Sequence, residues 1–207
     1  MLSLFMSEFM SEQKTHIAVF DFDGTLTTKD TFIEFAYFVH GRLYTWFTIL
    51  LFSPLLLLMK LHLANNSKVK QLMFSFLYKG MDYLRFKQLG SDFANIIDSF
   101  VRKSTFYELN NFKHNAVPIY IVSASIDAWV RPWCVKHGIG NVICTEIAID
   151  NGVVTGKFLT PNCFGPEKVK RLSAAVGTLE DQYVTVFGDS RGDKELMRIA
   201  NKVFLVQ

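Results

Sequence analysis

Short apolar runs without polar interruption lie near both ends of the chain and predict buried β-strands. They are found at 16–19, 117–122, 183–187 and 203–206. Continuous rather than alternating hydrophobicity is typical of a strand that is covered on both faces, as in a parallel sheet. Two further runs, 146–150 and 153–158, flank Asn151-Gly152, a strong signal for a hairpin turn. The pattern therefore predicts a mainly parallel sheet and one β-hairpin.

Helical patterns separate these strands and also fill a long block between the first two. They lie at 31–39, 43–59, 67–78, 82–101, 105–115, 127–137, 167–176 and 194–200. Strands that alternate with helices around a purely helical insertion are typical of a doubly wound α/β fold. We therefore predict a Rossmann-like core made of residues 15–30 and 105–207, an inserted all-helical cap at 31–104 and a flexible tail at 1–14. Pro132 is compatible with its helix only if it lies in the first turn.

The segment 43–59 is the most apolar part of the expected cap. It contains 17 residues without a charge, bounded by Arg42 and Lys60. As a helix it would extend over about 25 Å, less than the roughly 30 Å of a hydrocarbon core. Pro54 lies within it and should kink or divide the helix. We favour a cap helix that is buried or faces a membrane, and a helix that spans the bilayer is the alternative.

Composition and charge narrow the classes of protein that fit this pattern. Half of the 207 residues are apolar and 20 residues are Phe, which is ample for a core and argues against disorder. A net charge of +3 is too small to indicate a nucleic-acid partner. The tail at 1–14 lacks the basic start and continuous apolar stretch of a signal peptide. An odd number of cysteines without CxxC spacing indicates reduced, structural thiols in a cytosolic protein: Cys134, Cys144 and Cys163.

Two carboxylates follow the first strand directly. Asp21 and Asp23 are two residues apart, so at the end of an extended segment they point to the same side. Like charges placed so close together repel each other and raise a pKa, unless a cation or a reaction uses them. This pair therefore marks candidate chemistry.

Three more polar positions stand at or after expected strand or loop ends: Ser123, Lys168 and Gly188–Asp193, which reads GDSRGD. Because ligands of doubly wound sheets bind beyond the carboxyl ends of the strands, we expect all three to meet the carboxylate pair there. Taken singly, each has a structural alternative. The serine would suit a turn or a helix cap, the lysine a solvated first turn, and the two aspartates an Asx turn and a helix cap.

The motif DFDGTLT at 21–27, a strand that ends in Ser123, then Lys168 and GDSRGD at 188–193 together resemble the haloacid dehalogenase superfamily of aspartate-nucleophile phosphatases. The position of the helical insertion looks like the phosphoserine-phosphatase branch. The resemblance implies a Mg²⁺-dependent phosphomonoester phosphatase, in which Asp21 is the nucleophile and forms an aspartyl-phosphate.

The resemblance also implies an acid/base and a metal site. Asp23 would protonate the leaving alcohol and later take a proton from the attacking water. Mg²⁺ would be held by Asp21, by the main-chain carbonyl of Asp23 and by Asp189, all hard oxygen ligands of the kind that this ion prefers.

A phosphate cradle is implied in the same way. The hydroxyl of Ser123 and main-chain groups at Ala124 and Gly24 would hold phosphoryl oxygens, and Lys168 would offset their negative charge. Asp193 would not contact the phosphate itself but would hold Lys168 or a metal-bound water.

The cap leaves the substrate open. Asp30 lies nine residues after Asp21, where phosphoserine phosphatases carry an acid that meets the substrate ammonium. Its structural alternative is the N-cap of the first cap helix. Between residues 43 and 84 the chain has no arginine to bind a substrate carboxylate, and lysine is not a bidentate replacement.

Other segments resemble the phosphatidylglycerophosphatase C type: Asp30-Thr31-Phe32, the apolar segment 43–59, the hairpin at 146–158 and the sequence CFGPEKV at Cys163–Val169. For such a lipid phosphate, 43–59 would make peripheral contact with a membrane interface, with its aromatic residues at the boundary. We then expect a protein of the cytoplasm or of the inner face of the membrane. The alternatives are a phosphotransferase or mutase of the same superfamily and a membrane-associated binding protein with a vestigial site.

Overall fold

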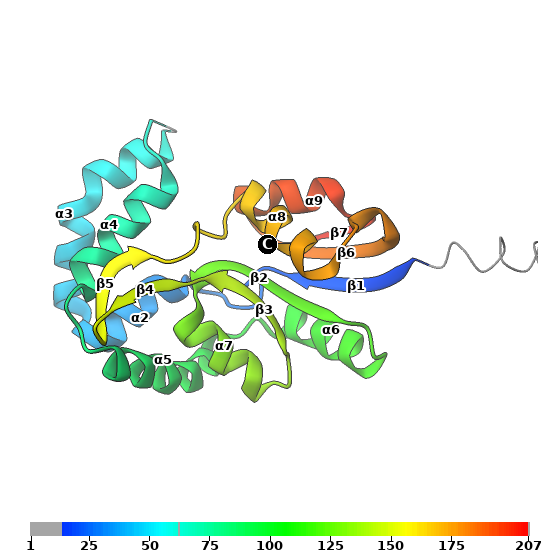
Figure 1. Ribbon diagram of the computed structural model, residues 1–207, viewed down its shortest axis with the longest axis horizontal. Helices are drawn as coiled ribbons and strands as arrows, with labels where there is room; N and C mark the ends of the chain where they lie inside the picture. Colours follow the sequence, from blue (N-terminus) through cyan, green and yellow to red (C-terminus); the bar gives the residue numbers. More distant parts are fainter. Residues whose placement is uncertain (1–13, 62, 207) are drawn as a thin grey trace, which may run out of the picture.

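The computed structural model describes residues 14–61 and 63–206, so most of the predicted tail lies outside the described residues. At its centre is a five-stranded parallel sheet with the strand order β3-β2-β1-β6-β7 (Figure 1). The strands are β1 (Thr15–Phe20), β2 (Ile119–Ile126), β3 (Asn141–Thr145), β6 (Gln182–Gly188) and β7 (Lys202–Leu205). The central strand β1 pairs with β2 and β6, which come from far along the chain. This sheet confirms the predicted doubly wound α/β core.

Helices cover both faces of the sheet, because the strand side chains alternate between two hydrophobic cores. In β1, Ile17 and Val19 belong to one core, and Ala18 and Phe20 belong to the other. Figure 1 shows helices on both sides of the sheet. The covering helices are α6 (Lys103–His114) and α7 (Asp127–Lys136) on one face, and α8 (Pro166–Val176) and α9 (Lys194–Ile199) on the other.

Within the described residues, four helices between β1 and α6 form a group at the left of Figure 1, which we call the helical cap. They are α2 (Thr31–His40), α3 (Arg42–Lys60), α4 (Asn66–Tyr78) and α5 (Tyr83–Ile97). Phe35 is fully buried at the centre of the cap, where its ring contacts Tyr78, Phe86, Phe93 and, in α7, Trp129. This aromatic cluster joins the cap to the core, and the domain boundaries at 30 and 105 stay a prediction.

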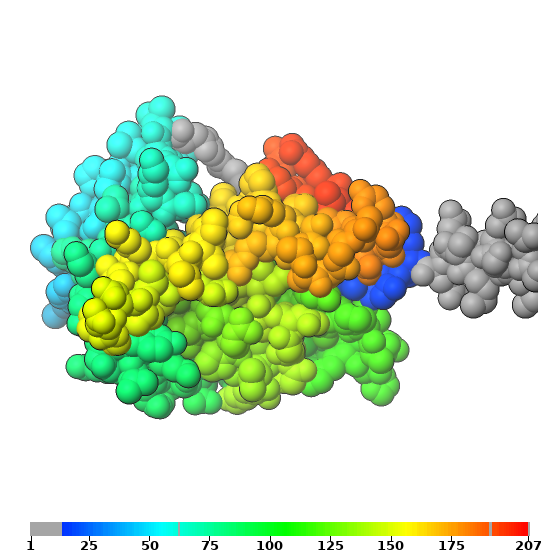
Figure 2. Space-filling view, viewed as in Figure 1, coloured from blue at the N-terminus to red at the C-terminus, as the bar shows by residue number. Residues whose placement is uncertain are grey.

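The predicted hairpin packs against the cap. Its strands β4 (Ile147–Asp150) and β5 (Val153–Phe158) are antiparallel. The N–H of Val154 donates to the Met81 carbonyl and its carbonyl accepts from the N–H of Gly80, both at 2.9 Å. The hairpin lies beside α4 and crosses the front of the molecule between the cap and α8 (Figures 1 and 2). It therefore ties the cap to the core in addition to the two chain connections.

Helix α3 differs from the prediction in two respects. It continues without a break through Pro54, and only Thr45 and Thr48 are buried. The carbonyl that loses its helical donor to the proline is that of Leu50, which is exposed, so the helix accommodates the loss. Of the two positions that the prediction left open for this segment, burial inside the cap was wrong, since only 11% of its most apolar 18 residues are buried. Among the described residues, α3 is the one helix whose length and composition would allow it to cross a membrane.

Two smaller features also differ. The sequence pattern does not predict β3, a short strand at the edge of the sheet. Pro132 lies in the middle of α7 rather than in its first turn, so the Ala128 carbonyl has no helical donor. Gly90 of α5 packs on this carbonyl, where an added Cβ would lie 2.3 Å from the oxygen. The position of the proline is thus tolerated at a close contact between two helices.

Candidate active site

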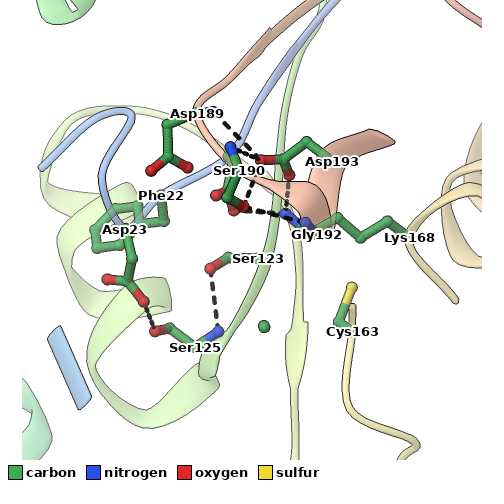
Figure 3. Close-up of polar contacts among 12 residues, drawn as sticks. Phe22, Asp23, Ser123, Ser125, Cys163, Lys168, Asp189, Ser190, Gly192 and Asp193 are labelled. Carbon is green, nitrogen blue, oxygen red and sulfur yellow. Dashed lines mark hydrogen bonds and ion pairs between the residues drawn. The ribbon is translucent and has the colours of Figure 1, made fainter. Parts of the chain in front are cut away.

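The polar residues singled out in the sequence meet at the carboxyl edge of the sheet. Asp21 and Asp23 directly follow β1, Ser123 lies in β2, Lys168 in α8, and Asp189 follows β6. All five line one cavity of about 600 Å³. Figure 3 shows how Asp23, Ser123, Lys168 and Asp189 lie around it. They meet because the carboxyl ends of parallel neighbouring strands lie at the same edge.

Lys168 is a buried cation between two carboxylates. Its Nζ donates to Asp21 Oδ1 at 2.6 Å and to Asp193 Oδ1 at 2.5 Å. Burial raises the pKa of Asp21 to about 7, although Lys168 acts to lower it. Burial also opposes the charge of the lysine, but the two carboxylates outweigh it and raise the pKa of Lys168. The lysine is therefore charged at neutral pH, and the solvated alternative is wrong.

The turn after β6 holds Asp193 in place. Its Oδ2 accepts from the N–H groups of Asp189 and Ser190 at 3.3 and 3.2 Å, and from the Ser190 hydroxyl at 3.1 Å. Gly188 allows this close approach, because an added Cβ would lie 2.8 Å from Asp193 Cβ. With its other oxygen on Lys168, Asp193 links the lysine to the turn that carries Asp189.

The carboxylates at this edge fit a divalent cation. One oxygen each of Asp21, Asp189 and Asp193 lies within 4.8 Å of the others. Gly24 makes room for this group, since an added Cβ would lie 2.1 Å from Asp189 Oδ2. Because Asp193 is already bound to the lysine and to its own turn, Asp21 and Asp189 are the carboxylates suited to ligate. Carboxylate oxygens of this kind suit Mg²⁺.

The expected phosphate ligands line the same cavity. Ser123 is buried, and its Oγ accepts from the N–H of Ser125 at 3.1 Å. Ala124 and Gly24 lie beside it in the cavity wall. The strand was expected to end in Ser123, but β2 continues to Ile126, and its pairing with β3 shifts register over this stretch. The strand pairing around Ser123 is therefore irregular.

Asp23 is held by groups that the sequence analysis did not identify. Its Oδ1 accepts from the N–H and the hydroxyl of Thr31, at 2.9 and 2.6 Å, and its Oδ2 accepts from the hydroxyl of Ser125. Burial and the charge of Asp30 raise the pKa of Asp23, against the effect of Lys70. Ser125 lies two residues after Ser123, so strand alternation could have indicated it. Nothing in the sequence pattern indicated Thr31.

Asp30 caps helix α2. Its Oδ1 accepts from the N–H groups of Phe32 and Ile33 at 2.9 and 3.2 Å. The structural alternative for this residue is thus confirmed, and a role toward a substrate ammonium stays a prediction. A second charged cap residue, Lys70, also lines the cavity, and its Nζ donates to the Ala124 carbonyl at 3.0 Å.

One wall of the cavity is apolar and comes from the cap. Its side chains belong to α2, α3 and α4: Phe32, Ile33, Ile49, Leu56, Met59, Val69 and Met73. Helix α3 therefore has two apolar faces, one toward the cavity and one toward solvent. The site combines a charged floor with a wall suited to an apolar group.

The fold and the site together define a hydrolase with a doubly wound α/β core and a carboxylate-lysine centre. The model of the haloacid dehalogenase-like hydrolases matches residues 18–198, and the chain belongs to this family. The chain is 29% identical to protein CicA of Caulobacter vibrioides over 188 residues, which is 90% of this chain and 83% of that protein.

Solved structures share the fold at low sequence identity. A protein of unknown function from Bordetella pertussis Tohama I has a TM-score of 0.80 at 17% identity, over 93% of this chain and 90% of that chain. A phospho-aspartyl intermediate analogue of phosphoserine phosphatase has a TM-score of 0.63 at 18% identity, over 93% of this chain and 87% of that one. At these identities the likeness establishes the fold alone.

Proposed function

We propose that the protein is a Mg²⁺-dependent phosphomonoester phosphatase that works through an aspartyl-phosphate on Asp21. The observation that carries this proposal is the buried Lys168 bridging Asp21 and Asp193 beside a second carboxylate, Asp23. A nucleophilic carboxylate needs nearby positive charge, because the phosphate that it attacks is itself an anion. The lysine supplies part of that charge.

The reaction uses two carboxylates with different partners. Asp21 attacks phosphorus, the bond to the ester oxygen breaks, and Asp23 gives its proton to the leaving alcohol. Water then attacks the aspartyl-phosphate while Asp23 takes back a proton, which releases inorganic phosphate and restores both side chains. Asp21, Asp189 and the main-chain carbonyl of Asp23 would hold Mg²⁺, which when bound supplies further positive charge at the phosphate.

The cavity favours a phosphomonoester with an apolar group, a membrane lipid phosphate, over a small metabolite. Support comes from the apolar wall, to which α3 contributes in addition to its exposed apolar face, and from the lack of an arginine between residues 43 and 84 that could bind a phosphoserine carboxylate. Peripheral contact of α3 with the inner face of the membrane would place the cavity mouth beside such a substrate.

Phosphate release from a panel of esters tests the reaction. We expect the purified protein to hydrolyse 4-nitrophenyl phosphate only with Mg²⁺, and a chelator to abolish turnover. Asp21→Asn should lower turnover by at least about 10³-fold, because no nucleophile remains. Asp150→Asn, an exposed aspartate on the hairpin, is the matched control and should leave turnover unchanged. Equal activity of wild type and Asp21→Asn would overturn the proposal.

The substrate class is tested separately. Phosphatidylglycerophosphate in detergent micelles should be hydrolysed with a higher kcat/KM than phosphoserine or nucleoside monophosphates. A clear preference for phosphoserine would overturn the lipid assignment and leave the phosphatase reaction intact.

A further inference from the structure

We propose that Thr31, Ser125 and Trp129 are positioning residues that hold the carboxylate of Asp23 toward the leaving group. This inference rests on the proposed phosphatase reaction, in which Asp23 is the acid and base. The three residues come from three elements, α2, β2 and α7, and their relative exposure is zero. They therefore bring the cap, the sheet and a core helix to one carboxylate.

Trp129 fixes the direction of the first bond. An indole N–H can only donate, and that of Trp129 donates to Thr31 Oγ1 at 3.0 Å. The hydroxyl hydrogen of Thr31 is then directed to Asp23 Oδ1 at 2.6 Å. The N–H of Thr31 donates to the same oxygen at 2.9 Å, so one residue holds this oxygen at two points.

Ser125 holds the other oxygen. Its hydroxyl donates to Asp23 Oδ2, and its Oγ lies 3.0 Å from Thr31 Oγ1. A hydroxyl can accept as well as donate. When Asp23 carries the proton for the leaving alcohol on Oδ2, this oxygen still accepts from the Ser125 hydroxyl, so the proton points away from Ser125 and toward the leaving group. Every donor then still has an acceptor, so the contact survives both halves of the reaction.

The packing around Trp129 fixes the direction of its indole N–H. The ring of Trp129 stacks on Phe35 of α2, with centroids 4.4 Å apart and planes inclined by 30°. The torsion that turns a carboxylate about its last bond is broad, so an aspartate without such partners samples many orientations. Three donors on two oxygens restrict Asp23 to one.

Two substrates with different leaving groups distinguish a misoriented Asp23 from a general loss of structure. The leaving group of butyl phosphate is poor and needs a proton, whereas that of 4-nitrophenyl phosphate leaves without one. The ratio kcat/KM reports only the steps up to release of the alcohol. We expect Ser125→Ala to lower kcat/KM for butyl phosphate by about 100-fold and Trp129→Phe by about tenfold, out of the 10²–10⁴-fold that an acid contributes. For 4-nitrophenyl phosphate both variants should stay within about twofold.

Trp133→Phe is the matched control. Trp133 lies one turn further along α7, is equally buried, and donates its indole N–H to Asp98 Oδ1 at 2.8 Å instead. It should change the two esters equally. Ser125→Thr keeps the hydroxyl and should restore butyl phosphate hydrolysis relative to Ser125→Ala, and it decides the question should Trp129→Phe fail to fold.

Three outcomes overturn the inference: equal losses on both esters, no loss on either, or no recovery in Ser125→Thr. A wild-type protein that releases phosphate from neither ester would instead overturn the proposed function itself. The two failures are therefore distinguishable.

Discussion

Charged residues are usually exposed and apolar residues usually buried, but the carboxyl edge of the sheet and the outer face of α3 each reverse one of these tendencies. The edge buries charge, with Lys168 between Asp21 and Asp193. Helix α3 exposes apolar side chains, with Leu50 72% and Leu57 58% exposed. The buried charges balance one another within the chain, whereas nothing in the described chain covers the leucines. A contiguous exposed apolar surface indicates a partner outside the molecule.

Removal of the buried lysine should have the largest effect. Lys168→Met should lower phosphatase turnover by at least about 10³-fold, because Asp21 loses its countercharge. It should also lower the free energy of unfolding by about 3–5 kcal/mol, since two carboxylates are left buried without a cation. Turnover with 4-nitrophenyl phosphate and urea unfolding measure the two effects.

The control for this variant lies two residues away. Lys170 sits on the same helix with 77% of its side chain exposed, so Lys170→Met should change neither quantity. If Lys168→Met behaved like Lys170→Met, the balance of charges at this edge would not be what holds the site together.

The exposed face of α3 is tested by making it charged. Leu50 and Leu57 lie seven residues apart, on one side of the helix, and neither lines the cavity. The double variant Leu50→Glu/Leu57→Glu should bind anionic vesicles at least about 100-fold more weakly, because two leucines lose their burial. Co-sedimentation with vesicles measures binding, and micelle-free hydrolysis of 4-nitrophenyl phosphate should stay unchanged.

Leu84→Glu is the matched control for α3. This leucine is 74% exposed but lies on α5, away from the apolar face. Its variant should bind vesicles as wild type does. Absence of vesicle binding by the wild-type protein, or binding that the double variant retains, would refute the membrane contact.

The catalytic edge could be predicted because its residues follow strands. Asp21, Asp23, Ser123 and Asp189 stand in or directly after buried strands, and parallel strands bring such positions together whatever the details of packing. Thr31 could not be predicted, because its contact with Asp23 depends on how the first cap helix enters. The same is true of Trp129, which is 98 residues from Thr31 in the sequence.

The exposure of helix α3 and the existence of strand β3 could not be predicted from the sequence pattern. The apolar composition of α3 fits a buried helix and an exposed membrane-facing one equally well, so only packing distinguishes them. Strand β3 has five residues at the sheet edge, beginning with Asn141, and is specified by its pairing with β2. Neither feature has a periodicity that could have settled it.

The cost of buried charge should also appear in the pH dependence of stability without metal. Burial raises the pKa of Asp21 from 3.8 to about 7, so the folded protein binds more protons than the unfolded chain between these values. Stability in a chelator should therefore fall as the pH rises from about 4 to 7, by at most about 1.4 kcal/mol per pH unit for this one group. Urea unfolding at a series of pH values measures the slope.

Asp21→Asn should flatten that slope, since asparagine does not titrate in this range. If stability rose with pH, or if its fall with pH persisted in Asp21→Asn, other groups would set the pH dependence. Vesicle binding through α3 should not follow the same curve, because its leucines do not titrate.

The cap, which carries α3, packs on the catalytic core through the contact of α5 with α7. Gly90→Ala tests this contact and should have the smallest effect. Gly90→Ala places a Cβ 2.3 Å from the Ala128 carbonyl oxygen, so the helices must separate. The intrinsic helix propensity of alanine favours the variant by about 1 kcal/mol. The overlap costs more than that, and we expect a net loss of about 1–3 kcal/mol in the free energy of unfolding.

Gly140→Ala is the control for Gly90→Ala, because an added Cβ there meets nothing within 4 Å. It should leave stability unchanged or raise it slightly. If Gly90→Ala proved as stable as wild type, the cap would not depend on this contact. The aromatic cluster around Phe35 and the hairpin strand β5 would then be what holds α3 and its cavity wall over the catalytic edge.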